Sequence, residues 1–180
     1  MRDALLVIDA ITDFRHPDGG ELLASFRDRQ PALRQAIGAA RSRGVPVIYV
    51  NDSHDAWDPD VEGWIRRTVE RSGARDLLEA IAPRSGDAFL RKPRYSAFDH
   101  TALAILLERL EIERVLLAGA ATEMCVVQTA IDARELGLKV TILASACATV
   151  DAEDEAIALQ YAERVVGARV ERAREPMELP

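Results

Sequence analysis

Short apolar runs alternate with segments of helical periodicity along almost the whole chain. The runs predict strands at Ala4–Ile8, Val45–Val50, Ala88–Arg91, Arg114–Ala118 and Lys139–Leu143, with a weaker one at Ala168–Val170. The segments between them predict helices at Leu22–Arg43, Arg75–Ile81, Thr101–Leu110, Glu123–Leu136 and Ala152–Val166. Because consecutive parallel strands are joined by right-handed helical crossovers, this alternation predicts a three-layer α/β/α domain around a parallel sheet.

The composition predicts one cytoplasmic domain that spans residues 1–180. A chain of 180 residues with 48% hydrophobic residues can bury a substantial core. A net charge of −7 argues against nucleic acid or an anionic membrane as partner, because both favour a basic surface. No apolar run approaches the roughly 20 residues that span a bilayer. The start of the chain lacks the features of a signal peptide, and two cysteines are too few for a disulfide framework.

The segment Asn51–Gly73 is the longest stretch without a predicted element. It is polar, carries Trp57 and Trp64, and follows the second strand. Its position suits either a lid over a site or an ordinary surface excursion.

Three chemically active side chains follow predicted strands. Asp9 closes the first strand, Lys92 follows the third, and Cys125 follows the fourth. Ligands of open parallel sheets bind beyond the carboxyl ends of the strands, so we expect these side chains to face one site. The placement predicts a hydrolytic set in which Asp9 takes the thiol proton, Lys92 stabilises the thiolate and nearby amides hold an oxyanion.

Cys125 is expected in the first turn of a helix. Thr122 is a suitable N-cap, and the amides and dipole of a helix start favour a thiolate. Each residue taken alone also has an ordinary structural interpretation. A lone cysteine is often a buried hydrophobe, an aspartate after a strand is often a helix cap, and a lysine is usually solvated. Their joint placement favours the chemical interpretation.

Four segments carry a family resemblance: VIDAITDF (7–14), VIYVND (47–52), KPRYSAF (92–98) and GAATEMCV (119–126). Together they resemble the isochorismatase-like cysteine hydrolases, a family that includes nicotinamidases and other amidohydrolases. The resemblance covers nearly the whole chain and implies a six-stranded parallel sheet. It places Asp9, Lys92 and Cys125 as the family's catalytic triad. It also implies a cis peptide between Ala120 and Ala121, which would aim the amides of Ala121 and Cys125 at an oxyanion.

The resemblance predicts a hydrolase that acts on C–N bonds other than peptide bonds. Cys125 would attack a small amide and form a thioester acyl-enzyme that water then hydrolyses. Two alternatives stay open: an enol-ether hydrolase, as in the family members that cleave isochorismate, and a redox or binding protein that uses Cys125. Asp9 favours a hydrolase, because a redox sensor gains little from a carboxylate base. The resemblance also implies a homo-oligomer.

We expect no cofactor and no metal ion. Asp52 and His54 reproduce only the start of the metal-binding pattern of metal-dependent nicotinamidases, and one histidine with carboxylates is a weak basis for a site. We assign Phe14, Trp57 and Tyr95 to substrate binding, as walls for a flat or apolar ligand. Ile11 and Glu123 depart from the residues common in the family, where a Gln and an Asp respectively are usual, so we expect unusual substrate contacts.

Overall fold

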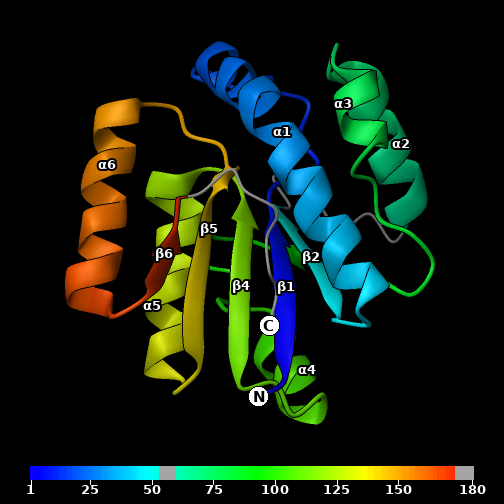
Figure 1. Ribbon diagram of the computed structural model, residues 1–180. Helices are drawn as coiled ribbons and strands as arrows, with labels where there is room; N and C mark the ends of the chain where they lie inside the picture. The colour runs from blue at the N-terminus through cyan, green and yellow to red at the C-terminus, as the bar shows by residue number, and fades with distance from the viewer. Residues whose placement is uncertain (53–59, 173–180) are drawn as a thin grey trace.

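The computed structural model describes residues 1–52 and 60–172, which form one layered α/β structure (Figure 1). Its strands make a fully parallel sheet in the order β3-β2-β1-β4-β5-β6. Their bounds are β1 (Asp3–Ile8), β2 (Val47–Asp52), β3 (Ala88–Lys92), β4 (Arg114–Gly119), β5 (Lys139–Cys147) and β6 (Arg169–Glu171). The predicted fold class is confirmed, and each predicted strand is present. The largest difference is at β5, which continues past Leu143 to Cys147.

The helices are α1 (Gly19–Ser42), α2 (Val61–Arg71), α3 (Arg75–Glu79), α4 (Leu103–Arg109), α5 (Val127–Glu135) and α6 (Ala152–Tyr161). A π-helical turn, η1 (Thr122–Val126), leads into α5, and a second, η2 (Ala162–Val166), ends α6. Helix α2 was not predicted from the sequence. Asp60 caps it by accepting a hydrogen bond from the Gly63 amide at 2.8 Å. None of the described helices is both long and apolar enough to cross a membrane.

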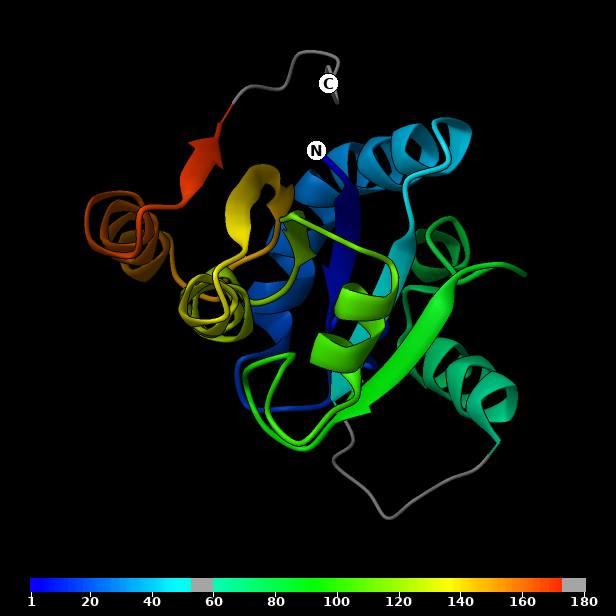
Figure 2. The ribbon, with the colours of Figure 1, turned by 90° about the horizontal axis from the view of Figure 1, so that it is seen from below.

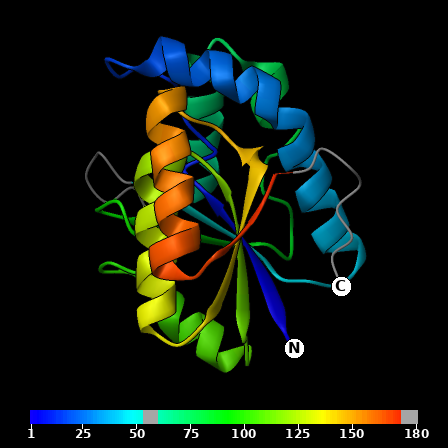
Figure 3. The same ribbon diagram turned by 60° about the vertical axis from the view of Figure 1, so that its left-hand side comes forward.

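Alternate residues of each central strand face opposite layers. Leu5 and Val7 of β1 pack with the layer of α1, α2 and α3. Ala4, Leu6 and Ile8 pack with the layer of α4, α5 and α6. Figure 3 shows α1 and α6 on opposite sides of the sheet. The continuous apolar run of β1 therefore reflects burial on both faces, which is typical of parallel sheets.

The sheet has its topological switch point between β1 and β4. From β1 the chain builds outward through β2 and β3, and it returns to the other side of β1 with β4. Connections on the two sides diverge there, and this opens a crevice at the carboxyl ends of the strands. Gly119, paired with Ile8, permits the close approach: it has φ 126°, and a Cβ on it would lie 1.9 Å from the Ile8 carbonyl oxygen.

Candidate active site

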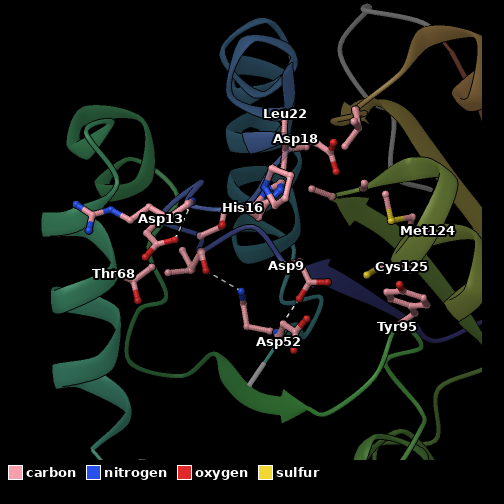
Figure 4. Close-up of a pocket in the computed structure, with 18 of the residues that line it drawn as sticks. Asp9, Asp13, His16, Asp18, Leu22, Asp52, Thr68, Tyr95, Met124 and Cys125 are labelled. Carbon is pink, nitrogen blue, oxygen red and sulfur yellow. Dashed lines mark hydrogen bonds between the residues drawn. The ribbon is translucent and has the colours of Figure 1, made fainter. Parts of the chain in front are cut away.

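Asp9, Lys92 and Cys125 come together at this crevice. The Lys92 ammonium lies 2.8 Å from Asp9 Oδ2 and 3.5 Å from Cys125 Sγ. The side chains of Asp9 and Cys125 are also in hydrogen-bond contact. Figure 4 shows Asp9 and Cys125 in the same pocket, with Tyr95 beside the sulfur. The convergence expected from the strand ends is thus present, although β3 lies two strands away from β1.

Backbone contacts hold the two charged partners. Lys92 is fully buried, and its ammonium also donates to the Arg94 carbonyl at 2.9 Å. Asp9 Oδ1 accepts a hydrogen bond from the Asp52 amide at 2.7 Å. Asp9 has φ 45°, in the left-handed region that aspartate tolerates better than most residues. The carboxylate is therefore fixed by β2 on one oxygen and by Lys92 on the other.

The proton of this cluster rests on the sulfur. Burial raises the pKa of the Cys125 thiol, and the Asp9 carboxylate raises it further, against the opposing effect of Lys92. Burial would lower the pKa of Lys92, but Asp9 and Cys125 outweigh it and hold that pKa above its usual range. Burial and the adjacent carboxylate therefore oppose the thiolate that a helix start was expected to favour, and Lys92 is the group that supports it.

Asp9 is placed to accept the thiol proton. Burial raises the pKa of the Asp9 carboxyl, while Lys92 lowers it. A carboxylate with a raised pKa is a better base than an exposed one. The cluster thus contains a protonated nucleophile, a strengthened base in contact with it, and a fixed cation that contacts both.

The turn that carries Cys125 differs from the predicted helix start. The Ala120–Ala121 peptide is cis, as predicted. Thr122 does not cap the helix: Ala121 holds the N-cap position, and no side chain caps this turn. The Thr122 hydroxyl lies instead 3.1 Å from the Ala148 carbonyl and 3.1 Å from Glu155 Oε1. Because the hydroxyl is engaged by these two partners, from the residue after β5 and from α6, it does not cap the turn that carries Cys125.

Two carboxylates, Glu155 and Glu123, link this turn to neighbouring elements. Glu155 is 8% exposed and pairs with Arg29 of α1 at 3.0 Å, while it accepts from Thr122. Glu123 accepts from the Thr149 hydroxyl and from the Val150 amide, each at 2.8 Å. Sequence reasoning missed Glu155, although its place four residues before the buried Leu159 put it on the inner side of α6. Both oxygens of Glu123 have partners in the loop after β5, so this departure from the family pattern braces the turn.

Cys125 lines a cavity of about 560 Å³ at the switch point. Tyr95 lines it as expected, and so does Ile11. Phe14 does not: its ring packs against Phe26 in the core, with ring centroids 5.5 Å apart. The φ of 57° at Phe14 turns this side chain inward, which the sequence did not reveal. Trp57 lies outside the described residues.

The remaining wall comes from α2, which lies within the segment Asn51–Gly73 considered as a lid, and from the residues that follow β1 and end β2. Trp64, Thr68 and Arg71 of α2 line the cavity. Polar and charged residues from the loop after β1 and from the end of β2 also line it: Asp13, Arg15, His16, Asp18 and Asp52. The loop after β1 has no periodicity, so nothing in the sequence directed its side chains toward the site. The cavity is therefore polar along one side and apolar around Ile11 and Leu22.

The described residues hold no group of three or more His, Cys, Asp or Glu side chains that is arranged to bind a metal ion. His54, which follows Asp52 in the metal-like pattern, lies outside that part of the chain. The predicted absence of a metal stays a prediction.

Comparison with known proteins identifies the family. The family described as "Isochorismatase domain" matches residues 3–174. The chain belongs to the isochorismatase family. Among family relatives, the uncharacterised isochorismatase family protein YaaI of Bacillus subtilis is 34% identical over 168 residues, 93% of this chain and 92% of that protein.

Two further isochorismatase-family relatives carry named activities. Maleamate amidohydrolase of Pseudomonas putida is 33% identical over 81% of this chain and 71% of its own length. The crystal structure of N-carbamoylsarcosine amidase from Thermoplasma acidophilum is 32% identical, covers 99% of both chains and superposes with a TM-score of 0.75. The resemblance stated from four short segments is therefore confirmed across the chain.

Proposed function

We propose that this isochorismatase-family protein is a cysteine amidohydrolase that cleaves the C–N bond of a small amide. One observation carries the proposal: Asp9 and Cys125 contact each other in the wall of a cavity of small-molecule size, and the buried Lys92 contacts both. The named activities of two relatives, a maleamate amidohydrolase and an N-carbamoylsarcosine amidase, support the amide class.

The reaction begins with proton transfer from Cys125 to Asp9. Sγ then attacks the carbonyl carbon of the amide, and the carbonyl oxygen gains the negative charge. The backbone N–H groups of Ala121 and Cys125 serve as the oxyanion hole. Asp9 returns the proton to the nitrogen as the C–N bond breaks, which releases ammonia or an amine and leaves a thioester on Cys125.

Hydrolysis of the thioester completes the cycle. Asp9 takes a proton from water, the hydroxide equivalent attacks the thioester carbon, and the proton returns to the departing sulfur. Lys92 stays protonated throughout, because its pKa is held above the usual range by Asp9 and Cys125. Its fixed charge stabilises the Cys125 thiolate that forms before attack on the amide, and again the thiolate that leaves when the thioester is hydrolysed.

A redox role for Cys125 is less well supported. Peroxide reacts with thiolates, and Cys125 has a raised thiol pKa and is only 8% exposed. Enol-ether cleavage, the other alternative, is an outcome of the same experiment.

The test measures ammonia or amine release from a panel of small amides, including maleamate and N-carbamoylsarcosine, and, in parallel, cleavage of an enol ether. We expect turnover of at least one amide by the unaltered protein and none by Cys125→Ala. Cys147→Ala is the matched control, because Cys147 is a second buried thiol, at the end of β5, fully buried and absent from the cavity wall. Turnover that survives in Cys125→Ala, or an enol ether cleaved while the whole amide panel is inert, would refute the proposal.

A further inference from the structure

The outer side of α6 and η2 exposes three apolar side chains in a row. Ile157 is 66% exposed, Tyr161 47% and Val165 66%. Each follows the last by four residues, so the three lie along one side of the continuous helix formed by α6 and η2. We call this row the α6 stripe. Figure 2 shows α6 at the periphery of the molecule, beside the edge strand β6.

Opposite charges flank the α6 stripe. Glu153 lies one turn before Ile157, and Arg164 lies next to Val165; both are exposed. Nearby arginines are already paired, Arg169 with Glu171 and Arg172 with Glu163. Within residues 1–52 and 60–172, neither Glu153 nor Arg164 has an ion-pair partner. The helix therefore offers an acid near its start and a base near its end, neither of which is paired with another described residue.

A groove of about 540 Å³ runs beside the α6 stripe. Its lining includes Ala152, Ala156, Gln160 and Arg164. The two alanines are one turn apart and leave room at the surface for a large side chain from outside. The remaining lining is partly apolar and partly charged: Ile157, Leu159, Glu155, Glu163 and Arg172. The same helix thus carries an apolar row and, beside it, a groove with charged residues in its wall.

We propose that the α6 stripe is the interface with a second copy of this chain, in which the two α6 helices pack antiparallel about a two-fold axis. In such an interface, if residue i contacts residue j of the other copy, then j also contacts i. The intervals Glu153 to Arg164 and Ala156 to Tyr161 share one midpoint, between residues 158 and 159. A two-fold axis at that midpoint places Glu153 of each copy opposite Arg164 of the other. It also places each Tyr161 ring against Ala156 in the groove of the other copy.

Self-complementarity favours a second copy over other occupants. A membrane surface is disfavoured, because the start of the helix presents Asp151, Glu153 and Asp154. Binding of an unrelated protein would not require complementary residues at equal distances from one midpoint of the helix. A two-fold pair of helices requires that arrangement, and Glu153 with Arg164 and Ala156 with Tyr161 have it. The inference is independent of the proposed function, since it uses no residue of the cavity.

Charge exchange tests this geometry. The molar mass of the full chain is measured by light scattering and sedimentation over about 1 to 100 μM, the range of moderate self-association. We expect the unaltered chain to form dimers. Glu153→Arg and Arg164→Glu should each raise the dimer dissociation constant at least tenfold, because each places two like-charged contacts across the axis. The double variant Glu153→Arg/Arg164→Glu restores both pairs and should recover dimers.

An apolar substitution gives an independent reading. Tyr161→Glu should also raise the dissociation constant at least tenfold. Ile105→Glu, on α4, is the matched control, because Ile105 is 62% exposed but lies outside the α6 stripe; it should leave the constant unchanged. A monomeric unaltered chain, dimers unaffected by the single variants, or failure of the double variant to recover dimers would each overturn the proposal.

Discussion

Replacing Asp9 with Asn removes the negative charge from a buried ion pair and leaves the shape of the side chain almost unchanged. Lys92, fully buried and 2.8 Å from Asp9 Oδ2, then loses the carboxylate that it contacts and keeps the Arg94 carbonyl at 2.9 Å. Removing one partner of a buried pair typically costs about 3–5 kcal/mol of folding free energy. Asp9 is 16% exposed and the carbonyl contact persists, so we expect the lower end, about 3 kcal/mol.

In a domain of this size, 1 kcal/mol shifts Tm by roughly 2–4 °C, which predicts a decrease of about 6–12 °C for Asp9→Asn. The assay is thermal unfolding at pH 7, with urea denaturation as a second measure. Both Asp9→Asn and Asp9→Asn/Lys92→Met should be inactive, so stability is the discriminating quantity. The double variant should recover most of the loss, because Met carries no charge to leave unpaired. An unchanged Tm for Asp9→Asn, or a double variant no more stable than the single one, would refute the reasoning.

Four further outcomes follow from the structure. Gly119→Ala should lower the unfolding free energy by roughly 2 kcal/mol or more, because its Cβ would meet the Ile8 carbonyl at 1.9 Å. Gly38→Ala, with open space around the new Cβ in α1, should instead raise it by about 0.4–1 kcal/mol; equal effects in urea denaturation would contradict this. The ratio kcat/KM should rise with pH as Asp9 loses its proton, with a midpoint above the ordinary 3.8, because burial raises the pKa of this base; a midpoint at or below 3.8 would exclude it. Thr122→Val should lower kcat roughly tenfold with little change in KM, and Thr122→Ser should restore it; a change confined to KM would contradict a positioning role.

The sheet could be predicted from the sequence because its central strands are buried on both faces. That burial requires the unbroken apolar runs of β1 and β4, which no surface helix would show. Helix α2 was missed because much of it is exposed and its apolar residues, such as Trp64 and Val69, are separated by charged ones. Its cap Asp60 and the spacing of those apolar residues were nonetheless available as signals.

The contact of Asp9, Lys92 and Cys125 could also be predicted, since parallel strands bring their carboxyl ends to one edge. The predictions that failed, the Thr122 cap among them, concern features that depend on contacts between distant parts of the chain. The hydroxyl of Thr122 bonds toward Glu155, 33 residues away, and so it does not cap its own helix. The protonation of Cys125 depends on how deeply the folded chain buries it. Local sequence patterns indicate neither the partner of the Thr122 hydroxyl nor the burial of Cys125.

The formation of a thioester on Cys125 is the central claim, and mass spectrometry of the protein quenched during turnover of an amide tests it most directly. The account predicts a mass increase equal to the acyl group of the substrate, located on the peptide that contains Cys125 and absent from Cys125→Ala. An acyl group found on any other residue would contradict it, as would continuing turnover of the same amide by Cys125→Ala.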